Sequence, residues 1–280
     1  MQVFTTIRTL KEALESSYKD KIIGFVPTMG ALHKGHLSLV KNANKSTDIT
    51  VVSIFVNPTQ FDNSEDLVNY PTTLQNDLFL LEKTNCDIVF IPNVDEIYKG
   101  ITTAEHFDFD GLENVMEGEH RAGHFDGVGT VVKRLFEIVT PDLAFFGEKD
   151  FQQLQIIKKL VIKEKLNIKI IGNPIVRERD GLAMSSRNKR LTKEYRTAAP
   201  FIRKTLLEAK KIFGTKSAIE VTEYVTQAFN KHSLLKLEYF IIADELNLLT
   251  TTHIASNKHY RGFIAVYAGE IRLIDNISLQ

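Results

Sequence analysis

The chain has 280 residues, of which 43% are hydrophobic, enough for one large domain with a buried core and a second, smaller one. Lysine plus arginine and aspartate plus glutamate each number 35, so a global basic field that would attract nucleic acid or a membrane surface is excluded. The single cysteine, Cys86, excludes an internal disulfide and fits a reducing compartment. The chain has no apolar run of bilayer length and no signal-peptide segment at its N-terminus, so we expect a cytoplasmic protein.

Apolar, strand-like runs alternate with helix-like periods over the first two thirds of the chain. We expect strands at 22–26, 50–56, 88–91, 143–146 and 168–171, and helices at 36–44, 74–84, 128–138 and 151–166. This alternation predicts an α/β fold, a Rossmann-like parallel sheet with helices on both faces. Ligands of such sheets bind at the carboxyl ends of the strands, where the polar motifs described below occur.

The pattern changes near residue 175. A polar, turn-rich segment is followed by two helix-like and three strand-like stretches, at 193–213, 218–232, 237–243, 262–267 and 271–274. We therefore expect a Rossmann-like domain over residues 1–175 and a smaller C-terminal α+β domain over residues 176–280 that covers the site.

The stretch from Pro27 to Leu39 reads PTMGALHKGHLSL and joins the first expected strand to a helix. Glycine between a strand and a helix lets backbone N–H groups approach a phosphate closely. His33 and His36 are three residues apart, so they share one face at the opening of the helix and can donate to an anion there. The pattern predicts a nucleotide site of the H-x-G-H kind, although taken alone it also fits a turn with two exposed histidines.

A second motif, FVNPTQF at residues 55–61, follows the next expected strand. The amide of Gln60 can both donate and accept, which suits a hydroxyl or carboxylate ligand. The alternative interpretation is a capped turn with an exposed glutamine.

The third motif, FFGEKDFQQ at residues 145–153, places charged groups between a strand and a helix. Lys149 is a natural phosphate clamp, and Asp150 could hold Mg²⁺ or only cap the helix. Gln153 lies near the same strand ends as Gln60, so the two amides could grip one small polar substrate. The alternative is a surface charge cluster at a helix start.

Two loop-like stretches complete the set of candidates. Between residues 177 and 188, Ser185, Ser186 and Arg187 could bind phosphate on a flexible segment that closes over it, or a serine could simply cap a helix. Between residues 117 and 129, His120 and His124 suggest a metal, but a third ligand at zinc spacing is lacking, so we expect a flexible loop beside the site.

Together these motifs resemble those of the pantothenate synthetase (pantoate–β-alanine ligase) family. The resemblance rests on PTMGALHKGH, FVNPTQF, EGEHRAGHFDGV, FFGEKDFQQ and DGLAMSSRN, in the family's order and spacing within residues 22–190. It implies the class I nucleotidyl-transferring architecture, a homodimer, and ligation of pantoate to β-alanine through a pantoyl adenylate, with release of AMP and pyrophosphate. One departure is Thr72, which stands where the family commonly has arginine.

The resemblance also assigns residues to roles. It implies that His36 is catalytic. The chemistry of the implied reaction adds His33, Lys149 and Arg187 as groups that stabilise phosphate charge, and Asp150 is the candidate Mg²⁺ ligand from its carboxylate beside Lys149. Pantoate is expected at Gln60 and Gln153, and β-alanine near Gln60. ATP is expected on Met29, Gly30, Ala31, Leu32, His33, Lys34, Gly35, His36, Gly147, Glu148, Lys149, Asp150, Val176, Met184, Ser185, Ser186 and Arg187.

Two rival functions stay open at the level of sequence. Another nucleotidyl transferase would share H-x-G-H but would need neither both glutamines nor the FFGEKDFQQ block. A non-catalytic, RNA-binding descendant of the synthetase fold is disfavoured by the zero net charge.

Overall fold

The computed structural model describes residues 1–61 and 64–280, which form two compact units. The N-terminal unit comprises Met1–Glu148 and Gln152–Pro174. The C-terminal unit comprises Ile175–Gln280 together with Lys149–Phe151, a short segment that is separated from the rest of this unit in the sequence.

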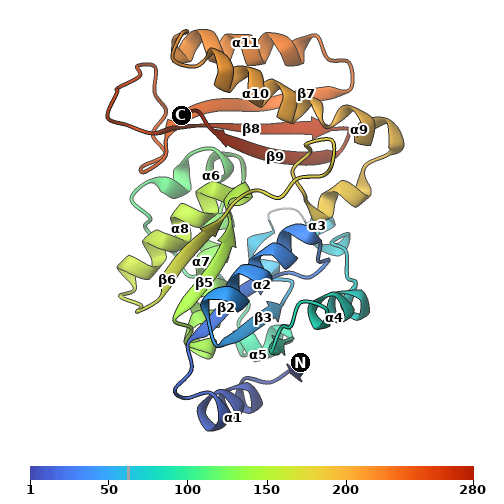
Figure 1. Ribbon diagram of the computed structural model, residues 1–280, viewed down its shortest axis with the longest axis vertical. Coiled ribbons are helices and arrows are strands. Elements are labelled where there is room, and N and C mark those ends of the chain that lie inside the picture. The colour runs from blue at the N-terminus through green and yellow to red at the C-terminus, as the bar shows by residue number, and fades with distance from the viewer. Residues whose placement is uncertain (62–63) are drawn as a thin grey trace. The chain divides into compact units, whose positions relative to one another are not determined.

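The N-terminal unit is built on a six-stranded sheet in which every pair of neighbours is parallel (Figure 1). Its strands are β1 (Gln2–Phe4), β2 (Ile23–Thr28), β3 (Ile49–Ile54), β4 (Ile88–Phe90), β5 (Leu143–Gly147) and β6 (Lys169–Asn173), in the spatial order β1-β4-β3-β2-β5-β6. The central strands are near-continuous apolar runs because helices cover both faces of a parallel sheet. The predicted parallel α/β sheet is confirmed, and only the short edge strand β1 was not expected.

Helices connect these strands, and the longer ones pack apolar side chains into the core. They are α1 (Ile7–Ser17), α2 (Lys34–Ser46), α3 (Ser64–Val68), α4 (Leu74–Glu82), α5 (Val94–Tyr98), α6 (Glu117–His120), α7 (His124–Val139) and α8 (Phe151–Lys163), with single 3₁₀ turns η1 (Pro58–Gln60), η2 (Leu112–Asn114) and η3 (Glu148–Asp150). In α7, for example, Val128, Val132 and Leu135 are all buried. The spacing is that of an amphipathic helix packed on a core.

The strand order creates a switch point between β2 and β5. The chain runs outward from β2 through β3 to β4, and later returns to place β5 on the other side of β2. In sheets of this kind, ligands bind outside the carboxyl ends of the strands at such a switch point. The H-x-G-H loop follows β2, and Gly147 ends β5.

The C-terminal unit is an antiparallel sheet with helices packed on one face (Figure 1). Its elements are η4 (Ser186–Arg190), α9 (Lys193–Ala198), α10 (Phe201–Ile212), α11 (Ala218–Asn230), β7 (Leu235–Asp244), β8 (Tyr260–Ala268) and β9 (Ile271–Ser278). The single helix expected at 193–213 is two helices, divided at Ala199 and Pro200. Proline lacks an N–H group and clashes with the preceding turn, so it begins the second helix.

The single cysteine, Cys86, is buried. Burial raises the pKa of the Cys86 thiol to about 12, so the thiol is an apolar core group without nucleophilic character.

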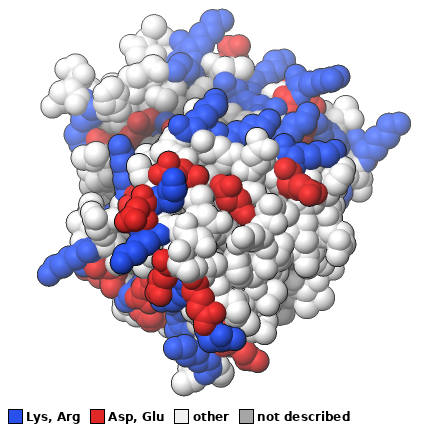
Figure 2. All heavy atoms as spheres, turned by 60° about the horizontal axis from the view of Figure 1, so that its bottom comes forward, with Lys and Arg blue, Asp and Glu red and all other residues white. Residues whose placement is uncertain are grey.

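Of the helices in the described part of the chain, none combines the length and apolar character that crossing a bilayer requires. Acidic and basic side chains are interspersed on the face drawn in Figure 2.

Candidate active site

The turn after β2 has an unusual backbone. Gly30 and Ala31 both have positive φ angles, of 80° and 49°. A Cβ atom at Gly30 would lie 3.1 Å from a carboxylate oxygen of Asp77 and also from a methyl group of Ile54. Glycine is therefore needed at this position both for the left-handed conformation and for the close approach.

A buried carboxylate holds this turn. Asp77, on α4, is 1% exposed and accepts hydrogen bonds from the backbone N–H groups of Ala31 (2.9 Å) and Leu32 (2.8 Å). The hydroxyl of Thr73 donates to it as well, at 3.1 Å. Sequence reasoning missed Asp77, because its backbone partners lie 46 and 45 residues away in the sequence.

His33 and His36 stand at the opening of α2. Their rings are stacked, with centroids 4.0 Å apart and planes 24° apart, so they share one face as their spacing predicts. His33 caps the helix, because its Nδ1 accepts from the N–H of Gly35 at 3.1 Å. A neutral His33 then carries its proton on Nε2, which can donate to an anion at the positive end of the helix.

Gln60 lies beside the same loop. Its Nε2 approaches Sδ of Met29 at 3.0 Å, and its Oε1 accepts from Nδ2 of Asn57 at 3.2 Å. Asn57 is fully buried and in turn accepts from the hydroxyl of Tyr98 at 2.5 Å. Burial raises the pKa of Tyr98, which keeps this hydroxyl protonated as a donor. The structure thus brings Gln60 to Met29 and fixes it through a buried amide.

The stretch from 117 to 129 is helical, where a flexible loop was expected. Gly123, with φ of 74°, separates α6 from α7, and α7 begins at His124, four residues before the expected helix. The His124 ring contacts the Gln60 carbonyl and Arg121. Within the described residues, no group of three or more His, Cys, Asp or Glu side chains is arranged to hold a metal ion.

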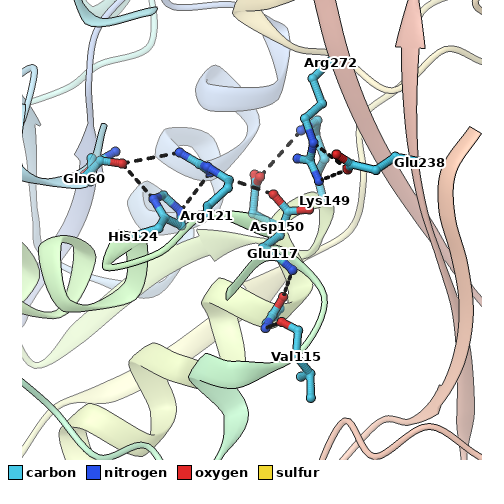
Figure 3. Close-up of polar contacts among 10 residues, drawn as sticks. Gln60, Val115, Glu117, Arg121, His124, Lys149, Asp150, Glu238 and Arg272 are labelled. Atoms are coloured by element: carbon cyan, nitrogen blue, oxygen red, sulfur yellow. Dashed lines mark hydrogen bonds and ion pairs between the residues drawn. The ribbon is translucent and has the colours of Figure 1, made fainter. Parts of the chain in front are cut away.

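The residues that follow β5 belong partly to the N-terminal unit and partly to the C-terminal unit. Gly147 and Glu148 belong to the N-terminal unit, as does Gln153, which is half-buried on α8. Lys149 and Asp150 belong to the C-terminal unit, with Nζ of Lys149 lying 3.5 Å from Oδ1 of Asp150 (Figure 3). The Lys149 carbonyl accepts from Nδ2 of Asn276 on β9 at 2.9 Å, an anchor that sequence analysis did not anticipate.

The serine-rich segment of the C-terminal unit is a short hairpin. Its bridge pairs Arg177 with Ala183, and Met184 N donates to Val176 O at 3.0 Å, so these two predicted ATP-site residues are brought together. Arg177 is held in place by Asp275 on β9, through two hydrogen bonds of 2.7 and 2.9 Å.

Ser185 follows the hairpin and caps η4. Its Oγ accepts from the N–H of Arg187 at 3.2 Å, as in the capping alternative, while Ser186 is buried and Arg187 half-buried. The cap does not use the hydroxyl proton of Ser185, which stays available as a donor.

These features match one known family. The model of the pantoate-beta-alanine ligase family matches residues 2–278. The chain belongs to the pantoate–β-alanine ligase family. Among its relatives, the pantothenate synthetases of Flavobacterium psychrophilum and Christiangramia forsetii are each 57% identical to it over 282 residues, covering 100% of both chains.

Solved structures of pantoate–β-alanine ligases give the same result. The pantothenate synthetase of Thermus thermophilus is 38% identical and superposes with a TM-score of 0.93, covering 100% of this chain and 99% of the other. The pantoate–β-alanine ligase of Francisella tularensis, solved in complex with β-γ ATP and β-alanine, is 37% identical, with a TM-score of 0.83 over 100% of this chain and 98% of the other.

Asp77→Asn should weaken the turn after β2. The amide keeps one acceptor oxygen, but its NH₂ group faces a backbone N–H, so the expected loss is about 1–3 kcal/mol in the free energy of unfolding. We also expect a raised KM for ATP. Urea denaturation and initial-rate kinetics measure the two effects.

Asp142→Asn is the matched control. Asp142 accepts from Ile23 N at 2.7 Å, at the opposite end of β2. That variant should lose stability without a change in the KM for ATP. An ATP dependence altered equally in both variants would contradict a specific role for Asp77.

Proposed function

We propose that this chain joins pantoate to β-alanine at the expense of ATP, producing pantothenate, AMP and pyrophosphate. The observation that carries the proposal is the stacked pair His33 and His36 at the opening of α2, with the amide of Gln60 beside Met29 of the same loop. This arrangement sets an anion-binding helix end next to a group that can recognise a hydroxy acid. The F. tularensis relative, solved with β-γ ATP and β-alanine, supports the assignment of both substrates.

The proposed reaction has two steps. The carboxylate of pantoate attacks the α-phosphorus of ATP and displaces pyrophosphate, which gives pantoyl adenylate. The amine of β-alanine then attacks the acyl carbon, expels AMP and loses a proton, which gives the amide. The nucleophiles come from the substrates, so the side chains act by positioning and by electrostatic stabilisation.

We assign ATP to both units. The loop from Met29 to His36 would take the phosphates on backbone N–H groups, on Nε2 of His33 and on His36, with Lys34 at the rim and Gly147 and Glu148 after β5. From the C-terminal unit, Lys149, Ser185, Ser186 and Arg187 would supply donors, next to the backbone of Val176 and Met184. Cations are needed because the attacking carboxylate and the triphosphate repel each other.

Pantoate is assigned to Gln60 and Gln153, and β-alanine to the neighbourhood of Gln60. The buried Asn57 limits the rotation of the Gln60 amide, which favours recognition of a fixed pattern of oxygens. Thr72 replaces the family's usual arginine, and the intact motifs argue that activity is retained.

Asp150 is the proposed Mg²⁺ ligand. Its carboxylate is about half exposed, with a side-chain exposure of 48%, and lies beside Lys149. One carboxylate completed by phosphate oxygens and water is the donor set that Mg²⁺ commonly uses with nucleotides. A bound Mg²⁺ would supply charge neutralisation on the phosphates. We also propose a cytoplasmic homodimer, with residues 1–175 binding ATP and pantoate and residues 176–280 covering the site.

A pyrophosphate-release assay tests the function. We expect release with ATP and pantoate, and little release when other hydroxy acids or nicotinamide mononucleotide replace pantoate. Release that prefers nicotinamide mononucleotide would instead support a different H-x-G-H nucleotidyl transferase.

His36→Ala should fold normally and lose adenylate formation. Removal of one preorganised donor from a site of developing charge typically costs about 10²–10³ in rate. The measurement is pyrophosphate release, with circular dichroism to establish folding. Near-normal pyrophosphate release by the folded variant would show that adenylate formation does not depend on His36.

Arg187→Ala should separate the two steps. Pyrophosphate leaves only in the first step, and a guanidinium can meet the charge that develops as the bond between the α- and β-phosphates breaks. We expect slow formation of pantoyl adenylate from ATP but nearly wild-type amide formation from preformed pantoyl adenylate and β-alanine. Single-turnover measurements of each step check this. Equal damage to both steps would mean that Arg187 holds the AMP portion or the fold.

A further inference from the structure

The backbone of Met116 is strained. This residue, immediately before α6, has φ of 47° and ψ of −112°, a region that residues other than glycine rarely adopt. Its side chain is 1% exposed, so the strained residue is packed into the interior. Strain of this kind persists only where the surrounding structure enforces it, and it occurs preferentially near functional sites.

The enforcing group is the amide of Gln152 on α8. Its Nε2 donates to the carbonyls of Leu112 (2.8 Å) and Val115 (2.7 Å), and its Oε1 accepts from the N–H of Glu117 at 3.0 Å. Gln152 is 4% exposed, and these contacts involve backbone groups on both sides of Met116. One buried side chain therefore fixes the path of the chain into α6.

The next contacts lead from Glu117 to Gln60. The buried Glu117 carboxylate lies 3.8 Å from Nη1 of Arg121, and Nη2 of Arg121 donates to the Gln60 carbonyl at 3.3 Å. Nη1 of Arg121 also lies 3.0 Å from Nε2 of His124, whose Nδ1 lies 2.8 Å from the same carbonyl. Figure 3 shows Arg121 between Glu117 on one side and Gln60 and His124 on the other.

The chemistry of these groups determines the tautomer of His124. A carbonyl only accepts, so Nδ1 carries the proton, and a guanidinium only donates, so Nε2 is the acceptor. His124 is therefore neutral and makes a directed hydrogen bond to Gln60 O. Glycine permits the approach of α7, because a Cβ atom at Gly127 would lie 2.2 Å from Thr59 O.

We propose that Gln152, Glu117, Arg121 and His124 form a positioning network that sets Gln60 relative to Gln153 for pantoate. The network begins at the residue adjacent to Gln153 on α8 and ends on the main chain of Gln60. It thereby ties together the two amides assigned to pantoate, and the inference rests on that assignment. Gln152 is a positioning residue, since it acts through Glu117 and its neighbours.

The first test is Gln152→Leu, measured by pantoate-dependent pyrophosphate release. The variant keeps the volume but removes the hydrogen bonds of Gln152 to three backbone groups, so kcat/KM for pantoate should fall about tenfold or more. The KM for ATP should stay within about twofold, because the loop after β2 is held separately by Asp77. In a Gln60→Ala background the further loss from Gln152→Leu should shrink to about twofold, since the amide being positioned is gone.

Asn44→Leu is the matched control. Its amide also holds backbone carbonyls, those of Thr84 (2.5 Å) and Asn85 (3.4 Å), near the C-terminal end of α2. It should lower the melting temperature without changing the pantoate dependence. If it reproduces the selective loss for pantoate, general destabilisation explains the effect and the inference is wrong.

A pair of variants at His124 covers the case in which Gln152→Leu does not fold. The amide of asparagine can take the place of Nδ1–H, so His124→Asn should retain most of the pantoate kcat/KM, whereas His124→Leu should lose about tenfold. Equal losses in the pair, or losses shared equally by ATP and pantoate, would overturn the positioning role while leaving the proposed function intact. A wild-type protein that releases no pyrophosphate with pantoate would overturn both.

Discussion

The hydrogen bonds from Ala31 and Leu32 to the buried carboxylate of Asp77 hold the turn on which the proposed nucleotide site depends. Left-handed backbone at a residue with a side chain costs roughly 1–2 kcal/mol at Ala31. Hydrogen bonds to a charged group contribute about 1.5–3 kcal/mol each, so the two bonds outweigh that cost. These bonds hold the turn that joins the end of β2 to the start of α2, which His33 caps.

The zero net charge of the chain is compatible with a site for two anions, because recognition here is local. The donors assigned to phosphate are a helix opening, two imidazoles, two hydroxyls and a few cations, and such groups act over less than a Debye length of about 8–10 Å. The bidentate pair between Arg177 and Asp275 illustrates a different use of charge. It fixes the hairpin that precedes Ser185, and its guanidinium is already committed to a carboxylate.

Hydrophobic periodicity predicted the parallel sheet, because burial on both faces leaves a strong pattern in β2, β3 and β5. Among the helices described for the same unit it predicted α2, α4, α7 and α8 but missed α1 and the short α3, α5 and α6. It missed β1, where three residues are too few to show a pattern, and it merged α9 with α10 across Pro200. Motifs indicated candidate groups that are local in sequence, such as His33 and His36. They could not indicate Asp77, nor the bond from Asn276 to the backbone of Lys149, because those partners meet only through tertiary structure.

Adjacent residues on a helix point about 100° apart, so Gln152 and Gln153 cannot face the same environment. The structure commits Gln152 to three backbone groups of the segment before and within α6. Gln153 is then directed to a half-buried position without needing a rigid partner of its own. A substrate-binding amide must exchange water for ligand, so it cannot be fully satisfied by the protein. Under the proposed assignment of Gln153 to pantoate, rigidity supplied by the neighbouring Gln152 resolves that conflict.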